Sequence, residues 1–374
     1  MITITPVTTK KQLATFIDFP HELYADDPNY VPELYIAQRD ILTPGKHPFF
    51  KHSSLQCFLA ADENNKLKGR IAAILNNNHN AFNHTNDGFF GFFDAVNDDA
   101  VAKALFEEAA GWLKAKGVET MIGPANPSTN ETAGLLIDGF DEPPVVLMTY
   151  NKPYYIDLIK KNGFNKKVDL YAYDIRTDTV SDRSLKLQDA LMRRLDQKKI
   201  TIRPINVKDF KNEVRKIREI YNAAWDKNLG FVPMTESEFN YLAKDFKNIL
   251  NPDFGLVAEH EGKMVGFALA VPDINQILKK IKRGRLLPTG IFKLLLGLKK
   301  INYYRVITLG VIEEYRRLGI EACFYAKIIQ MGVKYKLKGA EGSWILETND
   351  MMNKALQNIN GKVYKTYRIY EKAL

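Results

Sequence analysis

The chain has 374 residues, 45% of them hydrophobic and 26% charged, and a formal net charge of +9 at pH 7. This length and composition exclude a disordered or fibrous protein and are typical of a globular chain with two domains. The two cysteines, Cys57 and Cys323, lie far apart in the sequence, so they predict neither a disulfide framework nor a metal site. The net positive charge is compatible with an anionic partner but does not indicate which one.

The hydropathy pattern predicts a cytoplasmic protein. The first residues, MITITPVTTKKQ, lack the basic segment and apolar core of a signal peptide. The longest apolar run, near 291–298, contains a lysine and is too short to span a bilayer. We therefore expect no transmembrane segment, and the small number of cysteines suits a reducing compartment.

The first half of the chain predicts an alternation of strands and helices. In chain order we expect a strand at 2–7, a loop-rich segment at 26–52, a hairpin at 57–75, a strand at 89–96, a helix capped by Asp98 and Asp99 and ended by Gly117, a strand at 118–124, a turn-rich segment at 123–150, a helix at 154–164 and a strand at 166–175. The turn-rich segment holds four polar candidates for a substrate pocket, although turn chemistry alone explains asparagine there. They are Asn126, Asn130, Glu131 and Tyr150.

The second half repeats the first. Ala61, Lys66 and Gly69 align without a gap on Ala258, Lys263 and Gly266, an offset of 197 residues (258 minus 61). The Asn-Gly pair at 162–163 matches another at 360–361, and each pair is followed by a basic strand that bears tyrosines. We therefore predict two copies of one α/β fold, at 1–176 and 200–374, joined by a polar, helix-prone connection at 177–199.

One stretch of the second half indicates a phosphate site. Val306 to Leu309 reads as a buried strand, Arg316 to Gly319 as a basic turn, and the residues from Ile320 onward as a helix. The first N–H groups of a helix lack internal partners, and the helix dipole makes that end positive. A glycine permits close approach of a ligand, and arginines bind phosphate oxygens, so the turn predicts a pyrophosphate cradle.

The strand, the R-x-x-G turn and the helix together resemble the acyl-CoA loop of the GNAT superfamily of N-acyltransferases. The resemblance covers nearly the whole chain and implies two mixed, mainly antiparallel sheets flanked by helices. It also implies a site for acetyl-CoA or another acyl-CoA in the second copy. The residues implied in cofactor binding are Leu309, Gly310, Val311, Arg316, Arg317, Leu318, Gly319, Ile320, Glu321, Ala322, Asn349 and Asn353.

The sequence departs from the GNAT pattern at three places. Glu321 stands where the family has a small residue, and Leu356 stands where the family has the tyrosine that protonates the leaving thiolate. A solvent proton, or Tyr325, Tyr364 or Tyr367, would have to serve in place of that tyrosine. Glu313, Glu314 and Glu347 are candidate general bases, acting directly or through water. In the first copy the R-x-x-G turn is replaced by residues 97–99, Asn-Asp-Asp, so that copy resembles a degenerate GNAT domain.

Residues 274–300, here called the insertion, separate the second hairpin from the loop strand. Every charged residue in it is basic: Lys279, Lys280, Lys282, Arg283, Arg285, Lys293, Lys299 and Lys300. A solvated cover or a self-association surface explains this composition, and so does a site for an anionic substrate or a membrane surface.

Three functions remain open on this basis. The first is an acyl-CoA-dependent N-acyltransferase acting on a small-molecule or peptide amine, with acetyl transfer as the first candidate. The second is a non-catalytic binding protein that keeps the fold. The third is a transferase that uses aminoacyl-tRNA, because Fem-type enzymes also pair two GNAT-like domains. The chain lacks the basic and aromatic pattern of a nucleic-acid module, so we expect no nucleic-acid partner.

Overall fold

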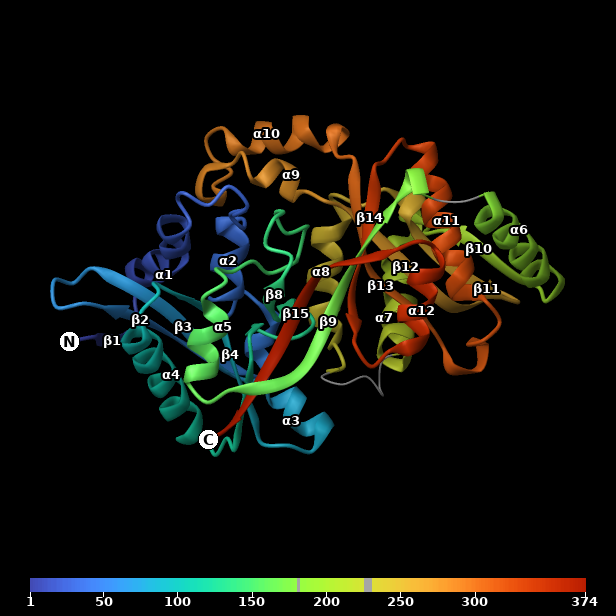
Figure 1. Ribbon diagram of the computed structural model, residues 1–374. Helices are drawn as coiled ribbons and strands as arrows, with labels where there is room; N and C mark the ends of the chain where they lie inside the picture. The colour runs from blue at the N-terminus through green and yellow to red at the C-terminus, as the bar shows by residue number, and fades with distance from the viewer. Residues whose placement is uncertain (180–181, 225–230) are drawn as a thin grey trace. The chain divides into compact units, whose positions relative to one another are not determined.

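The computed structural model describes residues 1–179, 182–224 and 231–374 and divides the chain into two compact units (Figure 1). The first unit comprises Met1–Leu170, Asn275–Leu295 and Lys365–Leu374. The second unit comprises Tyr171–Ile274 and Leu296–Tyr364. Most of the insertion and the end of the chain thus belong to the first unit, whereas sequence order alone places them with the second copy. Within the described residues, no helix is long and apolar enough to cross a membrane.

The first unit is built on a sheet with the strand order β1-β2-β3-β4-β5-β15. Its elements are β1 (Thr3–Pro6), α1 (Lys10–Leu23), α2 (Tyr35–Ile41), β2 (Ser54–Ala61), β3 (Leu67–Leu75), α3 (Asn77–Asn83), β4 (Asp87–Ala95), α4 (Asp99–Lys114), β5 (Thr120–Gly123), β6 (Ala125–Asn126), β7 (Thr132–Ala133), β8 (Leu135–Asp138), α5 (Tyr155–Lys161) and the start of β9 (Asn165–Arg176). The insertion adds α9 (Asn275–Leu278) and most of α10 (Gly290–Gly297), whose last two residues belong to the second unit.

The second unit is built on a sheet with the strand order β9-β14-β13-β12-β11-β10. Its elements are α6 (Asp182–Gln197), β10 (Ile200–Pro204), α7 (Phe210–Ala224), α8 (Glu236–Lys247), β11 (Gly255–His260), β12 (Lys263–Pro272), β13 (Tyr303–Val311), α11 (Ile320–Lys334), β14 (Gly339–Leu346), α12 (Asp350–Asn358) and the start of β15 (Lys362–Ala373).

The two units repeat one order of elements, as the sequence predicts. Apart from α3 and β6–β8 in the first half of the chain and α9 and α10 in the second, each runs strand, two helices, hairpin, strand, helix, strand, helix, strand. The hairpins β2–β3 and β11–β12 are both antiparallel. The final strands are exchanged: β9 ends beside β14 in the second unit, and β15 ends in the first unit, where Tyr370 lies opposite Gly123 of β5. Each unit is therefore completed by a segment from the other half of the chain.

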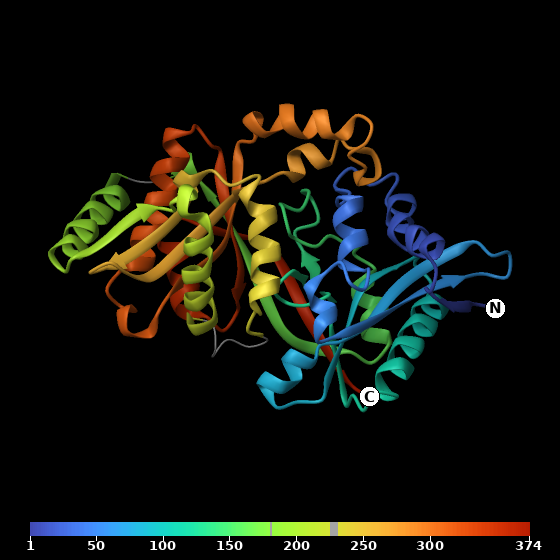
Figure 2. The ribbon, with the colours of Figure 1, turned by 180° about the vertical axis from the view of Figure 1, so that it is seen from behind.

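Alternating apolar residues on the strands form the core of the first unit. Helix α1 lies on one side of the β2–β3 hairpin and α4 on the other, in the views of both Figure 1 and Figure 2. Phe93 of β4 and Phe106 of α4 bring their ring centroids within 4.7 Å, and Tyr155 packs beside them. Burying such rings removes a large apolar area from water, so the paired strands are fixed against α4.

Candidate functional site

In the second unit, β13 and β14 separate part of the way along their length, and the place where they separate is called the fork below. The two strands run parallel and pair from Tyr303 and Gly339 as far as Val306 and Gly342. Beyond that point the described residues show no further β13–β14 pair, while β13 stays paired with β12 up to Val311. A bulge marks the fork, because Leu269 lies opposite Thr308 and Ala270 opposite Val306. An extra residue in one strand bends it away from its neighbour, which explains the opening.

Backbone groups of β13 face this fork. The amide of Ile312 donates to the Val265 carbonyl at 3.1 Å, on the β12 side. Because successive residues of a strand point their amides to opposite edges, Leu309 and Val311 direct theirs toward the open side. Thr308 lies on β13 past the last pair with β14, and its buried hydroxyl oxygen has no hydrogen-bond partner in the described part of the chain. A strand edge with unpaired donors is suited to an extended amide-bearing ligand.

The turn after β13 leads these donors into the start of α11. Arg317 and Gly319 both have left-handed backbones, with φ of 70° and 91°. Gly319 is the N-cap residue of α11 and has no side chain to cap that end, but the carboxyl group of Glu321 accepts its own backbone N–H in the first turn. The other N–H groups of the first turn lack partners within the helix and are suited to an anion, because consecutive N–H groups in such a turn form an anion-binding concavity.

The two arginines of the turn have different surroundings. Arg316 is half-buried and donates to the Val311 carbonyl at 3.1 Å and to the Ala224 carbonyl at 2.8 Å, so it fixes the turn to β13 and α7. Arg317 is exposed and is the better placed of the two to meet a phosphate. Glu321 is half-buried in the first turn of α11, where burial raises the pKa of its carboxyl group.

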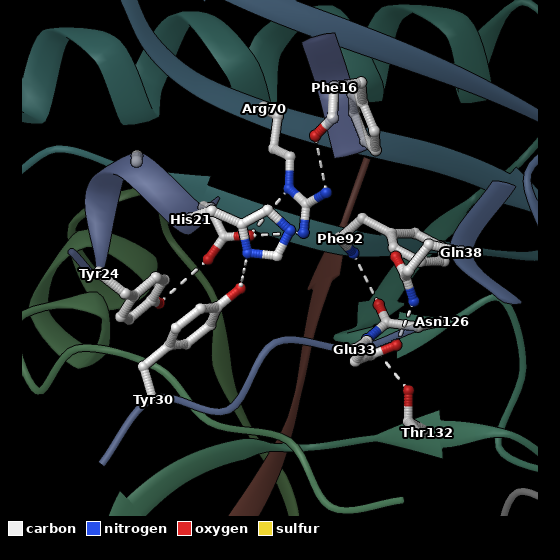
Figure 3. A network of polar contacts seen from close by, with 12 residues as sticks. Phe16, His21, Tyr24, Tyr30, Glu33, Gln38, Arg70, Phe92, Asn126 and Thr132 are labelled. Carbon is white, nitrogen blue, oxygen red and sulfur yellow. Dashed lines mark hydrogen bonds and ion pairs between the residues drawn. The ribbon is translucent and has the colours of Figure 1, made fainter. Parts of the chain in front are cut away.

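In the first unit, β4 and β5 separate in the same way, but residues 125–126 occupy the space beside β4. There the described residues of β4 and β5 pair from Asp87 to Phe89 and no further. Beyond that point the side-chain oxygen of Asn126 accepts the Phe92 amide at 2.6 Å, and its nitrogen donates to the Thr132 hydroxyl at 3.2 Å (Figure 3). A Cβ at Gly91 would lie 1.8 Å from the Ala125 carbonyl, so the filling segment lies directly on β4. No pantetheine arm could occupy the same edge.

The helix after β4 is also closed to anions. The carboxylate of Asp98 accepts the amides of Ala100 at 2.8 Å and Val101 at 3.4 Å. These are the first N–H groups of α4, so the position that would hold a phosphate already holds a carboxylate. The two helix starts differ in kind, because Asp98 caps α4 through two amides whereas Glu321 of α11 accepts its own amide. That the second unit alone binds the cofactor stays a prediction.

The four substrate candidates of the first unit fall into two groups. Asn126 belongs to the filled edge, and next to it the Ser128 hydroxyl accepts the Asn130 amide at 3.1 Å and donates to the Glu131 carboxylate. Tyr150 instead donates to the Asp27 carboxylate at 3.1 Å. All four residues thus have hydrogen-bond partners within the unit, and their role in binding a substrate stays a prediction.

The remaining predicted residues of the second unit lie on several segments. Glu313 and Glu314 are exposed in a short 3-10 turn, Glu313–Tyr315, after β13, and Glu347 is half-buried just after β14. Asn349 caps α12 by accepting the Met352 amide at 3.1 Å. Asn353 accepts the Tyr173 hydroxyl at 2.9 Å and donates to the Leu346 carbonyl at 3.1 Å, so it holds α12 to the end of β14.

A buried polar cluster at the fork escaped the sequence analysis. Arg305 and Glu341 face each other at the next-to-last β13–β14 pair, and Arg305 donates to the Ser343 hydroxyl at 2.8 Å. The hydroxyls of Ser343 and Tyr364 both donate to the Glu341 carboxylate. The available signal was a charged residue inside each of two apolar strands, since buried charges need partners. The cluster gives Tyr364, a candidate acid, a fixed partner.

A second buried network lies in the first unit (Figure 3). Arg70 of β3 forms an ion pair with Asp94 of β4 at 2.8 Å, and Asp94 also accepts the hydroxyls of Tyr24 and Tyr155 at 3.0 and 3.1 Å. These bonds satisfy the buried charges and join α1, β3, β4 and α5. Beside them His21 contacts the Tyr30 hydroxyl at 3.0 Å.

His21 is held neutral by its surroundings. Burial, with help from the nearby charge of Arg70, lowers the pKa of His21 to about 4, although Asp18 opposes the shift. The ring is therefore uncharged at neutral pH and contributes a hydrogen bond rather than a charge.

Comparison with known proteins identifies both relatives and the fold. Protein YghO of Escherichia coli is 37% identical over 374 residues, which cover 98% of this chain and 94% of YghO. The bacterial ceramide synthase of Caulobacter vibrioides is 35% identical over 382 residues, which cover 100% of this chain and 98% of that protein. No family model matches the chain.

Solved structures show the fold. The match with a tandem GNAT protein from the clavulanic acid biosynthesis pathway covers all of this chain and 98% of that protein, with a TM-score of 0.57 and 9% identity. A GCN5-related glucosamine N-acetyltransferase region of a fungal multi-domain β-N-acetylglucosaminidase matches with a TM-score of 0.59 and 11% identity. This chain spans 38% of the length of that larger protein. The predicted tandem GNAT fold is confirmed, and these likenesses show the fold alone.

Proposed function

This chain belongs to the family of Escherichia coli YghO and the bacterial ceramide synthase of Caulobacter vibrioides, and we propose that it is an acyl-CoA-dependent N-acyltransferase. A ceramide is the amide of a fatty acid and a long-chain amino alcohol. We therefore propose a long-chain amine as acceptor and favour a fatty acyl group over the acetyl group expected from the sequence.

The observation that supports this proposal is the contrast between the two forks. In the second unit, β13 leads past its last pair with β14 at Val306 into the left-handed turn at Arg317 and Gly319. In the first unit, Asn126 and Asp98 occupy the corresponding positions. The residues of the second unit thus fit one acyl-CoA. They offer a strand edge for its amide-bearing arm, a Thr308 hydroxyl without a partner among the described residues, and an anion site for its pyrophosphate.

Bound acyl-CoA would supply the activated thioester, and the protein would supply orientation and charge stabilisation. The amides of Leu309 and Val311 are suited to polarise the thioester carbonyl, because they point toward the fork and are preorganised by β12. Glu313, Glu314 and Glu347 remain candidates for accepting the amine proton. Tyr364 remains a candidate for protonating the departing thiolate, and its bond to Glu341 would orient its hydroxyl.

One observation favours the alternative of a non-catalytic binding protein. The half-buried carboxyl of Glu321 lies in the first turn of α11, where a phosphate would otherwise meet the helix. A charged Glu321 would weaken binding of a pyrophosphate by repulsion. The alternative therefore predicts poor affinity for CoA, whereas the enzyme proposal predicts binding and turnover.

The proposal is tested by product formation. Purified full-length protein is mixed with palmitoyl-CoA and sphinganine in detergent micelles, and N-acyl product and free CoA thiol are measured by mass spectrometry and a thiol reagent. We expect equal amounts of amide and thiol, both lost in Gly319→Val. Thiol release without amide would indicate only hydrolysis, and neither product, with CoA binding intact, would contradict the proposal.

A further inference from the structure

The insertion presents an apolar helix face that the described chain leaves uncovered. Phe292, Leu295 and Leu296 of α10 are 64%, 59% and 75% exposed, and Leu287 in the preceding turn is 79% exposed. Residues at spacings of three and four lie on one face of a helix. Figures 1 and 2 both show α10 on the outer side of α9. These three side chains are called the α10 face below.

Positive charge adjoins this face. The insertion contains no acidic residue, and six lysines in it are exposed: Lys279, Lys280, Lys282, Lys293, Lys299 and Lys300. The Lys293 ammonium group donates to the Lys280 carbonyl at 2.9 Å, which brings the turn that carries the first three lysines against α10. Apolar and basic side chains are therefore combined on one short segment.

The rest of the insertion is fixed to the first unit. Arg285 contacts the Asp18 carboxylate at 2.7 Å and lies 3.9 Å from the centroid of the Tyr35 ring. Arg283 contacts Glu22 at 3.3 Å, and the Asn275 side chain donates to the Pro144 carbonyl at 2.9 Å. Two of the eight basic residues thus serve as anchors. The segment that leads into α10 is therefore anchored to α1 by these contacts.

We propose that the insertion binds the surface of an anionic lipid bilayer. Lysines next to exposed aromatic and aliphatic side chains on a short helix match the charge and the depth of a bilayer interface. The eight residues of α10 extend about 12 Å, which allows insertion into the interface and not a crossing of the bilayer. This inference rests on the proposed function, because a long-chain amine resides in membranes and has to be reached there.

The experiment is flotation of the full chain with vesicles of phosphatidylcholine, alone or mixed with phosphatidylglycerol. We expect binding to the mixed vesicles that weakens with salt. Changing Lys279, Lys280 and Lys282 to Gln should weaken partitioning about a hundredfold, since each basic residue contributes about fivefold. Changing Phe292 and Leu296 to Gln should weaken it at least about tenfold. All melting temperatures should stay nearly unchanged, because these side chains are exposed.

Val333→Gln is the matched control, because Val333 is 53% exposed on α11, outside the insertion. It should bind vesicles like the wild type. Absence of vesicle binding by the wild type, or unchanged binding by both insertion variants, would overturn the proposal. Self-association in ultracentrifugation that the Phe292 and Leu296 changes abolish, without vesicle binding, would instead identify a contact between copies and would also overturn it.

A micelle assay separates this inference from the proposed function. The insertion variants should acylate sphinganine in detergent as the wild type does and lose activity only when the amine is presented in vesicles. Equal loss in micelles and vesicles would contradict a docking role. Wild-type protein that binds vesicles but forms no amide in either medium would contradict the proposed function and leave the docking inference supported.

Discussion

Gly319→Val changes the residue on which the proposed donor site most depends. Gly319 begins α11 with φ at 91°, a conformation that costs an L-residue about 1–2 kcal/mol or more. An added Cβ would lie 3.3 Å from a Leu191 methyl group, which can shift. We therefore expect the melting temperature to fall by a few °C, at about 2–4 °C per kcal/mol, and the fold to survive.

The effect on CoA binding should be much larger. The side chain would stand between the phosphate and the first N–H groups of α11, and each charged hydrogen bond contributes about 1.5–3 kcal/mol. Losing two of them weakens binding by about 3 kcal/mol or more, which is over a hundredfold. Isothermal titration with CoA measures this loss.

Gly117→Val is the matched control for backbone strain. Gly117 follows α4 in the first unit with φ at 78°, and no atom of the described residues lies within 4 Å of a Cβ added to it. It should be destabilised by a similar amount and bind CoA normally. Unchanged CoA affinity in Gly319→Val would refute the argument, and an equal loss of affinity in both variants would attribute the effect to strain.

Three further outcomes follow from the surroundings of single side chains. Arg317→Ala should weaken CoA binding about ten- to a hundredfold in titration, whereas Arg316→Ala should also lower the melting temperature, because its guanidinium holds two carbonyls. Glu321→Gln should tighten CoA binding about fivefold by removing a like charge, and unchanged affinity would show that the carboxylate points away from the site. The pKa of His21 is about 4 in the folded chain and about 6.5 in the unfolded chain. Between pH 6.5 and pH 4, therefore, this histidine is protonated in the unfolded chain and neutral in the folded one. The free energy of unfolding should therefore fall by about 1–2 kcal/mol as the pH drops from 7 to 4.5, after allowance for the partial exposure of His21. In His21→Gln the free energy of unfolding, measured by urea denaturation, should change less over this pH range.

The repeat and the loop could be predicted because short-range signals determine them. Asp98 precedes an apolar helical pattern and does cap α4, and Gly319 ends the basic turn and does begin α11. Helix starts, turns and strand alternation depend on residues a few positions apart. The matched glycines and alanines of the two hairpins then identified a fold that is present twice.

The filled edge and the buried networks could not be predicted for the opposite reason. Asn126 binds Phe92 across 34 positions of sequence, and Arg70 binds Asp94 across 24, so no local pattern indicates either partner. The turn chemistry of residues 123–150 is equally compatible with a solvent-exposed loop. The exchange of β9 and β15 is likewise a matter of topology, and residue order alone assigns each strand to its own half.

Hydrogen exchange of the full chain with and without CoA tests the central claim most directly. It needs no separated halves, which matters because each unit is completed by a strand from the other half of the chain. The account predicts slower exchange at the amides of residues 309–323 when CoA is present, and no change at residues 92–101 of the first unit. Protection of residues 92–101, or exchange unaffected by CoA at 309–323, would contradict a single donor site in the second unit.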